Sequence, residues 1–439
     1  MEKEEIDFKA HVLVLPYPAQ GHINPMLQFS KRLVSKGVKA TLANTIAINK
    51  SMHADPASKI DIETYSDGFD EGGFQQAEST DVYLSTLKLV GSKTLSDLIK
   101  RLKDSGRPVS TIIYDGFMPW AYDVAKQFGL LKVLFFTQSC AVNNVYYHIQ
   151  RGLLPLPVPG PTVSLPGLPL LHFSDISSFV SNLGSYPDFF NLVQNQFRNI
   201  DEAHWVLFNS FNKMEAEVVD WMAKRWRLGT IGPTLPSIYL DKRLEDDKDY
   251  EINLFKPDTS TCMNWLQDKP SGSVVYVSFG SMAELGAEQM EELACGLKAS
   301  NCYFLWVVRA SEKAKLPKNF IEETWEKSLV ISWCPQLQVL AHKATGCFLT
   351  HCGFNSWECL NGQINPEDVW KIGIRAQPEE KGMVRREVVE LCIREVMEGD
   401  KGKEIKENAN RWKNLATEAI DEGGSSDKNI DEFIAQLIN

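Results

Sequence analysis

Two polar side chains that could move a proton each follow an apolar run in the first half of the chain. His22 lies in PYPAQGHINP (16–25), just after HVLVL, and Asp115 follows TIIY in TIIYDGFMPW (111–120). A neutral imidazole can accept a proton near neutral pH, and a carboxylate on its other nitrogen fixes the tautomer and stabilises the imidazolium. If both runs are strands that end side by side, His22 and Asp115 can form a base and its partner. A structural histidine and a helix cap at Asp115 are the alternatives that spacing alone leaves open.

The residues after His22 predict the start of a helix. The pattern runs from about Asn24 to Ser35, with Asn24 as N-cap and Pro25 in the first turn. The positive end of a helix disfavours an imidazolium. We therefore expect His22, just before this helix, to be neutral, as a general base must be.

Two glycine turns in the second half could hold phosphate. VVYVSFGSMAEL (274–285) turns at Gly280, and TGCFLTHCGFNS (345–356) turns at Gly353. A glycine turn that leads into a helix presents backbone N–H groups suited to phosphate oxygens. Neither turn contains GxGxxG or GxxxxGK[ST], so each alone is equally well an ordinary strand-to-helix turn. Two of them in one domain favour a diphosphate ligand.

Further polar and aromatic residues lie near these turns. Asn355 and Ser356 start the helix after Gly353, and His351 precedes the turn, where it would donate to phosphate. Trp333 follows its own predicted strand and offers a flat face to a base. A nucleotide site is therefore the function that this half of the chain favours.

The alternation of apolar runs with amphipathic stretches predicts an α/β fold. Continuous apolar strands separated by helices indicate parallel sheets covered on both faces. Two such alternations predict two doubly wound domains facing a cleft, with ligands at the strand C-termini. The predicted organisation is a first domain (1–235), a linker (236–260), a second domain (261–415) and a helical segment that packs back on the first domain (416–439).

Composition excludes several partners. The chain has 439 residues and a net charge of −11, with no basic block. Nucleic acid and anionic membranes are therefore not expected as partners. No apolar stretch is long enough to span a bilayer, the start lacks the pattern of a secretory signal, and nine cysteines are scattered without a CxxC pair. We expect a cytoplasmic protein with reduced thiols and no metal cluster.

The segment WCPQLQVLAHKATGCFLTHCGFNS (333–356) resembles the signature box of plant family-1 UDP-sugar-dependent glycosyltransferases. PAQGHINP and DGFMPW resemble that family's N-terminal elements, and the resemblance covers nearly the whole chain. It implies the GT-B fold, two Rossmann-like domains, of which the first (1–235) binds the acceptor and the second (261–415) binds the UDP-sugar. It also implies an inverting glucosyltransferase that uses UDP-glucose, without a metal or a permanently bound cofactor. We expect a monomer.

The resemblance assigns a role to each candidate residue. His22 is the base, Asp115 its partner, Trp333 stacks on uracil and Gln336 lies near the nucleoside. The diphosphate ligands are His351, Asn355, Ser356 and Ser281. The acceptor is a hydroxyl or carboxyl of a small lipophilic plant metabolite such as a phenolic acid, steroid or triterpenoid. Residues that could line its pocket, or equally pack in the core, are Phe117, Met118, Trp120, Phe136, Tyr146 and Phe179, beside the irregular region 151–171.

The chain departs from the family after Ser356. The family's box continues through an apolar strand to residues that bind the sugar hydroxyls, whereas SWECLNGQINPEDVWKIG (356–373) contains no sustained apolar run. The ribose-binding glutamate corresponds to Glu358, one position early. Either this is a shortened variant or residues are left out of a longer natural chain. The alternative function is therefore a catalytically impaired protein that binds UDP or a metabolite.

Overall fold

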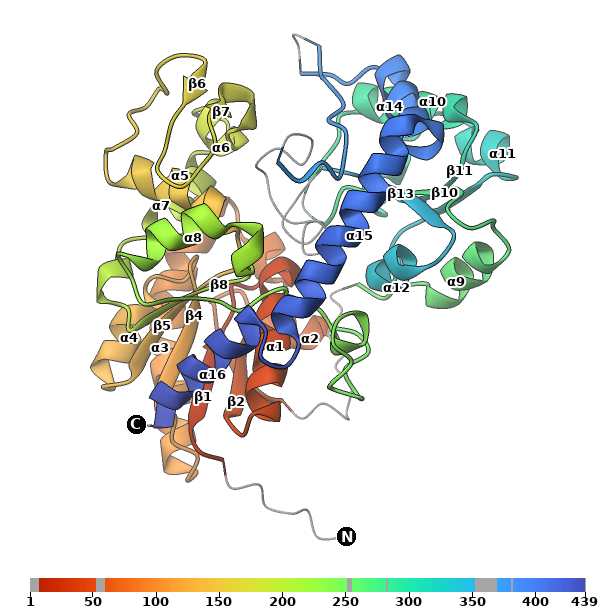
Figure 1. Cartoon of the computed structure of the whole chain (residues 1–439). Helices are drawn as coiled ribbons and strands as arrows, with labels where there is room; N and C mark the ends of the chain where they lie inside the picture. The colour runs from red at the N-terminus through yellow and green to blue at the C-terminus, as the bar shows by residue number, and fades with distance from the viewer. Residues whose placement is uncertain are drawn as a thin grey trace. The chain divides into compact units, whose positions relative to one another are not determined.

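The apolar runs of the first half form a seven-stranded parallel sheet (Figure 1). The computed structural model describes residues 8–52, 60–250, 255–281, 283–351, 369–379 and 382–438. In spatial order the strands are β3 (Asp61–Tyr65), β2 (Lys39–Thr45), β1 (His11–Leu15), β4 (Thr111–Asp115), β5 (Leu131–Phe136), β8 (Trp205–Phe208) and β9 (Leu228–Thr230). Every residue of β1 and β4 is buried, as expected of parallel strands covered on both faces.

Helices cover this sheet. They are α1 (Gln20–Ser35), α2 (Ile46–Ser51), α3 (Thr80–Asp104), α4 (Ala121–Gln127), α5 (Cys140–Gln150), α6 (Ser178–Ser181), α7 (Pro187–Asn195), α8 (Ala216–Ala223) and α16 (Ser425–Ile438). On one face, Phe29 of α1 and Phe433 of α16 share a core with Val12 and Val14 of β1. The last helix and the first strand, drawn blue and red in Figure 1, therefore belong to one core.

Helix α1 begins earlier than the sequence predicts. Its N-cap is Ala19, not Asn24, and Pro25 lies inside the helix. The first turn forms because the N–H groups of His22 and Ile23 both donate to the Ala19 carbonyl. His22 is consequently part of the first helical turn, still at the positive end of the helix.

A second parallel sheet carries the other half. Its strands, in spatial order, are β12 (Ser328–Ile331), β11 (Tyr303–Val307), β10 (Val274–Ser278) and β13 (Thr345–Thr350). Alternate residues of β10 enter different cores, Val275 and Val277 on one face and Val274 and Tyr276 on the other. Each face of this sheet therefore packs against a separate hydrophobic core. The helices of this half are α9 (Thr259–Gln267), α10 (Ala287–Ser300), α11 (Phe320–Thr324), α12 (Gln336–Ala341) and α14 (Arg386–Glu398).

The chain divides into two compact units, residues 1–254 with 415–439 and residues 255–414. Helix α15 (Asp400–Ile420) runs across the second boundary. Part of the segment predicted as linker contacts the first unit, because Arg32 pairs with both carboxylate oxygens of Asp241 and Lys31 lies 2.7 Å from Asp247. The Pro- and Gly-rich region 151–171 is irregular apart from β6 (Thr162–Val163), which pairs with β7 (Leu171–His172).

Candidate active site

The first unit brings His22 and Asp115 together. Strands β1 and β4 are neighbours in register, and α1 follows β1, so the first turn of α1 lies at the end of β4. The Nδ1 atom of His22 lies 2.7 Å from Oδ2 of Asp115, and both residues are buried. Because an ionised carboxylate can only accept, Nδ1 carries the hydrogen and Nε2 is the nitrogen that can take a proton. Asp115 Oδ1 also accepts from the Phe117 N–H at 2.9 Å, so one carboxylate serves both the turn and the imidazole.

Aromatic rings surround the imidazole. The ring of Tyr17 lies 5.3 Å from that of His22, centre to centre, and the ring of Phe117 lies 4.8 Å away. Burial, and then the negative charge of Asp115, raise the pKa of Tyr17 far above its ordinary value, so this hydroxyl stays neutral. His22 therefore packs against two aromatic rings, and its Nδ1 atom contacts the Asp115 carboxylate.

Thr137 is a contact of His22 that the sequence analysis missed. Its Oγ1 lies 3.3 Å from Nδ1 of His22. Thr137 follows β5, and β5 pairs with β4 such that Phe135 lies beside Asp115. The carboxyl ends of neighbouring parallel strands lie at one edge of the sheet, which brings Thr137 to the pair.

The six residues considered for an acceptor pocket divide into two groups. Phe117 contacts His22, and Phe179 is partly buried and stacks on Phe189 with ring centres 6.0 Å apart. The other four are buried core side chains: Met118, Trp120, Phe136 and Tyr146. Phe136, for example, stacks on Phe208 at 4.8 Å. Core packing is the role that the structure gives these four.

The second unit brings the first glycine turn beside His351. Strands β10 and β13 are paired so that Ser278 lies opposite Thr350, and Gly280 and His351 follow. Gly280 has φ +71°, and a Cβ there would be 2.9 Å from Cε1 of His351. Only glycine fits this turn, because both its backbone conformation and its neighbour exclude a side chain.

His351 is suited to donate without carrying a permanent charge. Partial desolvation, and then the positive charge of Arg309, lower its pKa below the ordinary value. The residue nevertheless keeps solvent-accessible surface. Ser281 is exposed, and its carbonyl accepts a hydrogen bond from Arg309. These two predicted phosphate ligands lie at the ends of adjacent strands.

Trp333 lies in the connection between β12 and α12, and Gln336 is the first residue of α12. The Trp333 ring packs on Phe255 with centres 4.6 Å apart, and the ring remains partly accessible. Gln336 starts α12, and its Oε1 accepts from the Tyr276 hydroxyl at 3.2 Å. Gly353, Asn355, Ser356 and Glu358 lie outside the described residues.

The described residues contain neither a cluster of metal-ligating side chains nor a membrane-spanning helix. No group of three or more His, Cys, Asp or Glu side chains there could hold a metal ion. Within the same ranges, every helix is too short or too polar to cross a bilayer.

A family model described as UDP-glucoronosyl and UDP-glucosyl transferase matches residues 10–362. The chain belongs to this family. It is therefore a UDP-glycosyltransferase, and its donor is a UDP-sugar. The match ends within the segment that departs from the signature box.

Two curated relatives from Arabidopsis thaliana match this glycosyltransferase almost end to end. UDP-glycosyltransferase 74F2 is 48% identical over 452 residues, covering 98% of each chain. Flavonol 7-O-beta-glucosyltransferase UGT74F1 is 47% identical, again over 98% of each. Both alignments are longer than the 439 residues of this chain, so the relatives carry residues that it lacks.

The fold matches a solved member of the family. The crystal structure of Os79 from O. sativa in complex with UDP superposes with a TM-score of 0.91 at 38% identity, covering 97% of this chain and 100% of that one. The predicted GT-B fold is thereby confirmed.

Proposed function

We propose that this glycosyltransferase moves glucose from UDP-glucose to a hydroxyl or carboxyl of a small lipophilic plant metabolite, with inversion at the anomeric carbon. The observation that carries the proposal is the 2.7 Å contact between His22 Nδ1 and Asp115 Oδ2 at the carboxyl edge of the first sheet. A neutral imidazole with a carboxylate behind it is suited to remove a proton from an alcohol.

Every proton and bond of the proposed reaction is accounted for by His22, Asp115 and the two substrates. His22 Nε2 takes the hydroxyl proton as the acceptor oxygen forms a bond to the anomeric carbon. The bond from that carbon to the phosphate oxygen breaks, and UDP leaves with the electron pair. Asp115 stabilises the imidazolium that results. Attack opposite the leaving group inverts the anomeric configuration, which gives a β-glucoside from the α-linked donor. The "beta" in the name of the flavonol relative agrees with this outcome.

Each half of the chain has one task in this proposal. The first unit supplies the base and binds the acceptor, with Phe117 and Tyr17 as apolar walls beside His22. The second unit binds the donor: Trp333 faces the uracil, Gln336 lies near the nucleoside, and His351 and Ser281 meet the diphosphate. From the sequence alone, Gly353, Asn355 and Ser356 complete the diphosphate ligands and Glu358 holds the ribose. Positioning both reactants and stabilising the departing charge would supply most of the rate.

The names of the relatives support the acceptor class. A flavonol glucosyltransferase at 47% identity and a mogroside synthase from Siraitia grosvenorii at 45% both cover nearly all of this chain. The acceptor we propose is accordingly a phenolic, steroid-like or triterpenoid compound. We also propose that the protein is cytoplasmic and monomeric.

One observation favours a second candidate, a protein that binds UDP without efficient transfer. The family match ends at residue 362, and the alignment with the 74F2 relative, over 452 residues, is longer than this chain. If the residues that hold the hexose hydroxyls are missing, uracil and phosphate contacts remain while sugar contacts do not. Loss of a strand would also leave backbone groups of its neighbours without ladder partners.

Three measurements on the purified protein decide between these functions. The first is its intact mass, since natural material clearly heavier than 49.5 kDa would show that the natural chain carries more residues. The second is UDP affinity by calorimetry, and the third is a mass-spectrometric screen of phenolic, steroid and triterpenoid acceptors with UDP-glucose. We expect UDP binding together with a β-glucoside product. UDP binding with no product on any acceptor would support the impaired protein, and absence of UDP binding would contradict both candidates.

A further inference from the structure

Of three charged side chains spaced three residues apart, the two cations contact the turn that follows β10 and the carboxylate contacts both cations. Arg309, Glu312 and Lys315 lie after β11, in the sequence RASEKAK, and the short helical turn at 313–315 brings such residues to one side. The turn they contact comprises 279–281 and 283–286, between β10 and α10. Its described residues form neither helix nor strand, so their carbonyls need partners from elsewhere.

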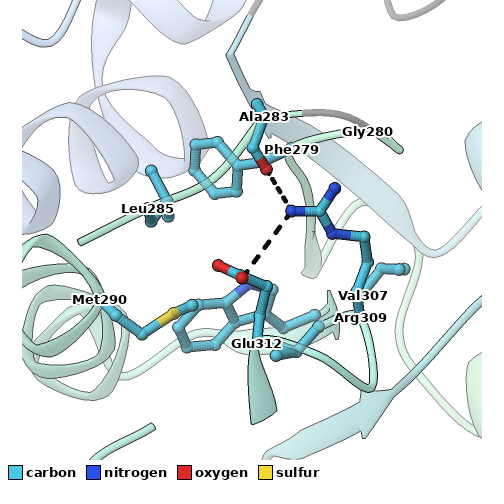
Figure 2. A pocket seen from close by; sticks show the side chains of 10 residues that line it. Phe279, Gly280, Ala283, Leu285, Met290, Val307, Arg309 and Glu312 are labelled. Atoms are coloured by element: carbon cyan, nitrogen blue, oxygen red, sulfur yellow. Dashed lines mark hydrogen bonds and ion pairs between the residues drawn. The ribbon is translucent and has the colours of Figure 1, made fainter. Parts of the chain in front are cut away.

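The two cations hold alternate carbonyls of this turn. One guanidinium nitrogen of Arg309 donates to the Ser281 carbonyl. The other donates to the Ala283 carbonyl at 2.5 Å (Figure 2). Lys315 Nζ donates to the Leu285 carbonyl at 3.0 Å. The planar guanidinium can bridge two acceptors at once, which a single ammonium cannot do in the same way.

Glu312 fixes the two cations from behind. Its two carboxylate oxygens each lie 3.0 Å from Lys315 Nζ, and one lies 4.0 Å from Arg309. The Glu312 side chain is 9% exposed and that of Arg309 is 16% exposed. Screening by water is therefore weaker here than for an ordinary surface pair. We call Arg309, Glu312 and Lys315 the carbonyl clamp.

Apolar side chains lie on the inner side of the turn. Phe279, Leu285, Met290 and Trp306 line a small hollow there that is open to solvent. Figure 2 shows the Phe279 ring and the Arg309 guanidinium on either side of the backbone at Ala283. The carbonyl clamp therefore supplies polar contacts to the turn, and these four side chains supply apolar ones.

We propose that Arg309 is a positioning residue of the donor site, which with Glu312 and Lys315 holds the turn after β10 in the shape that presents Ser281 and Gly280 to the diphosphate of the UDP-sugar. This inference rests on the proposed function. It goes beyond it, because Arg309 contacts the carbonyls behind the site and is none of its predicted ligands. His351 lies close to Gly280, so a shift of the turn would also displace this imidazole, a second predicted phosphate ligand.

The test compares UDP with uridine, which lacks the phosphates. The variants are Arg309→Met and Arg309→Lys, and the control is Lys298→Met, which removes a cation whose partner is the exposed Glu323 of the same unit. Calorimetry gives both affinities for each protein. Loss of charge-assisted hydrogen bonds should weaken UDP binding about tenfold in Arg309→Met. We expect uridine affinity to stay unchanged in every variant, and Lys298→Met to bind UDP as the wild type does.

The lysine variant separates charge from geometry. If the fork of the guanidinium shapes the turn, Arg309→Lys loses nearly as much UDP affinity as Arg309→Met. Wild-type UDP affinity in Arg309→Lys would overturn the inference, as would an equal loss of UDP and uridine affinity in Arg309→Met. A fall in melting temperature with an unchanged UDP-to-uridine ratio would also overturn it. Failure of the wild type itself to bind UDP would instead contradict the proposed function.

Discussion

The imidazole of His22 lies 2.7 Å from the carboxylate of Asp115, although 93 positions of sequence separate the two residues. The β1–β4 pairing explains this closeness, because it places the turn after β1 beside the end of β4. The carboxylate leaves His22 one nitrogen to act as a base.

Replacing Asp115 by Asn should leave the fold intact and reduce transfer to a hydroxyl. The amide oxygen can still accept from the Phe117 N–H, but a neutral group cannot stabilise the imidazolium. We expect kcat/KM to fall about 10²- to 10⁴-fold, the usual range for general base catalysis. Steady-state kinetics with UDP-glucose and an alcohol acceptor measures the change.

Tyr114→Phe is the matched control for Asp115→Asn. Tyr114 is the preceding residue, buried, and its hydroxyl has no hydrogen-bond partner among the described residues. Strand alternation turns its side chain to the other face of the sheet. Turnover should stay at the wild-type value. An equal loss in both variants would attribute the effect of Asp115→Asn to packing.

Replacing Trp333 by Ala should weaken uridine and UDP by the same factor. The indole face would be the stacking surface for uracil, worth about 1 kcal/mol or about fivefold in affinity. Trp333→Phe should recover most of the binding. The control is Trp265→Ala, which removes an indole of α9 that contacts Lys269, and it should change neither affinity. Selective loss of UDP binding, with uridine unaffected, would assign Trp333 to the phosphates and contradict the stacking role.

Stability of the second unit should depend on the Glu292–Arg386 pair. Hydrogen bonds from the side chain and then the backbone N–H of Arg386 lower the pKa of Glu292 from 4.5 to about 2. These contacts attach the start of α14 to α10. Glu292→Gln should reduce the free energy of unfolding by about 1–2 kcal/mol near neutral pH, with solvent around Arg386 limiting the effect.

The pH dependence of that loss has a definite sign. A depressed carboxyl pKa stabilises the fold above the unfolded pKa, and the stabilisation disappears as pH falls toward the folded pKa. The difference between wild type and Glu292→Gln should therefore be full near neutral pH and shrink between about pH 4.5 and about pH 2. Denaturant unfolding at several pH values measures it. Glu323→Gln, at the exposed pair with Lys298, is the control and should have little effect. A difference that grows on acidification would contradict the assignment.

Much of the sheet architecture was predictable from periodicity. The apolar runs HVLVL (11–15) and TIIY (111–114) each lie in a strand of the first sheet, since buried parallel strands have strongly apolar sequences. Strands β3, β8 and β9 were missed. The first, DIETY (61–65), lies at an edge with its residues partly exposed, so its sequence lacks an apolar run. The others are only four and three residues long.

The sequence predicted the paired residues of the candidate site, but not the residues that contact them or hold the neighbouring turn. His22 and Asp115 were identified because both follow apolar runs. Thr137 and Arg309 were missed, since a threonine after a strand and an arginine in a loop carry no pattern of their own. Their roles depend on strand order and on the shape of a turn, which only coordinates give. The start of α1 was wrong for a similar reason, because the Ala19 carbonyl accepts from two N–H groups without any capping side chain.

The most direct test of the proposed base is His22→Ala, measured with an alcohol acceptor, a carboxylic acid acceptor and UDP. An alcohol needs a base, whereas a carboxylic acid is already ionised near neutral pH. The account predicts unchanged UDP affinity, a loss of at least about 10²-fold in transfer to the alcohol, and a clearly smaller loss with the acid. Wild-type turnover of the alcohol by His22→Ala would contradict it.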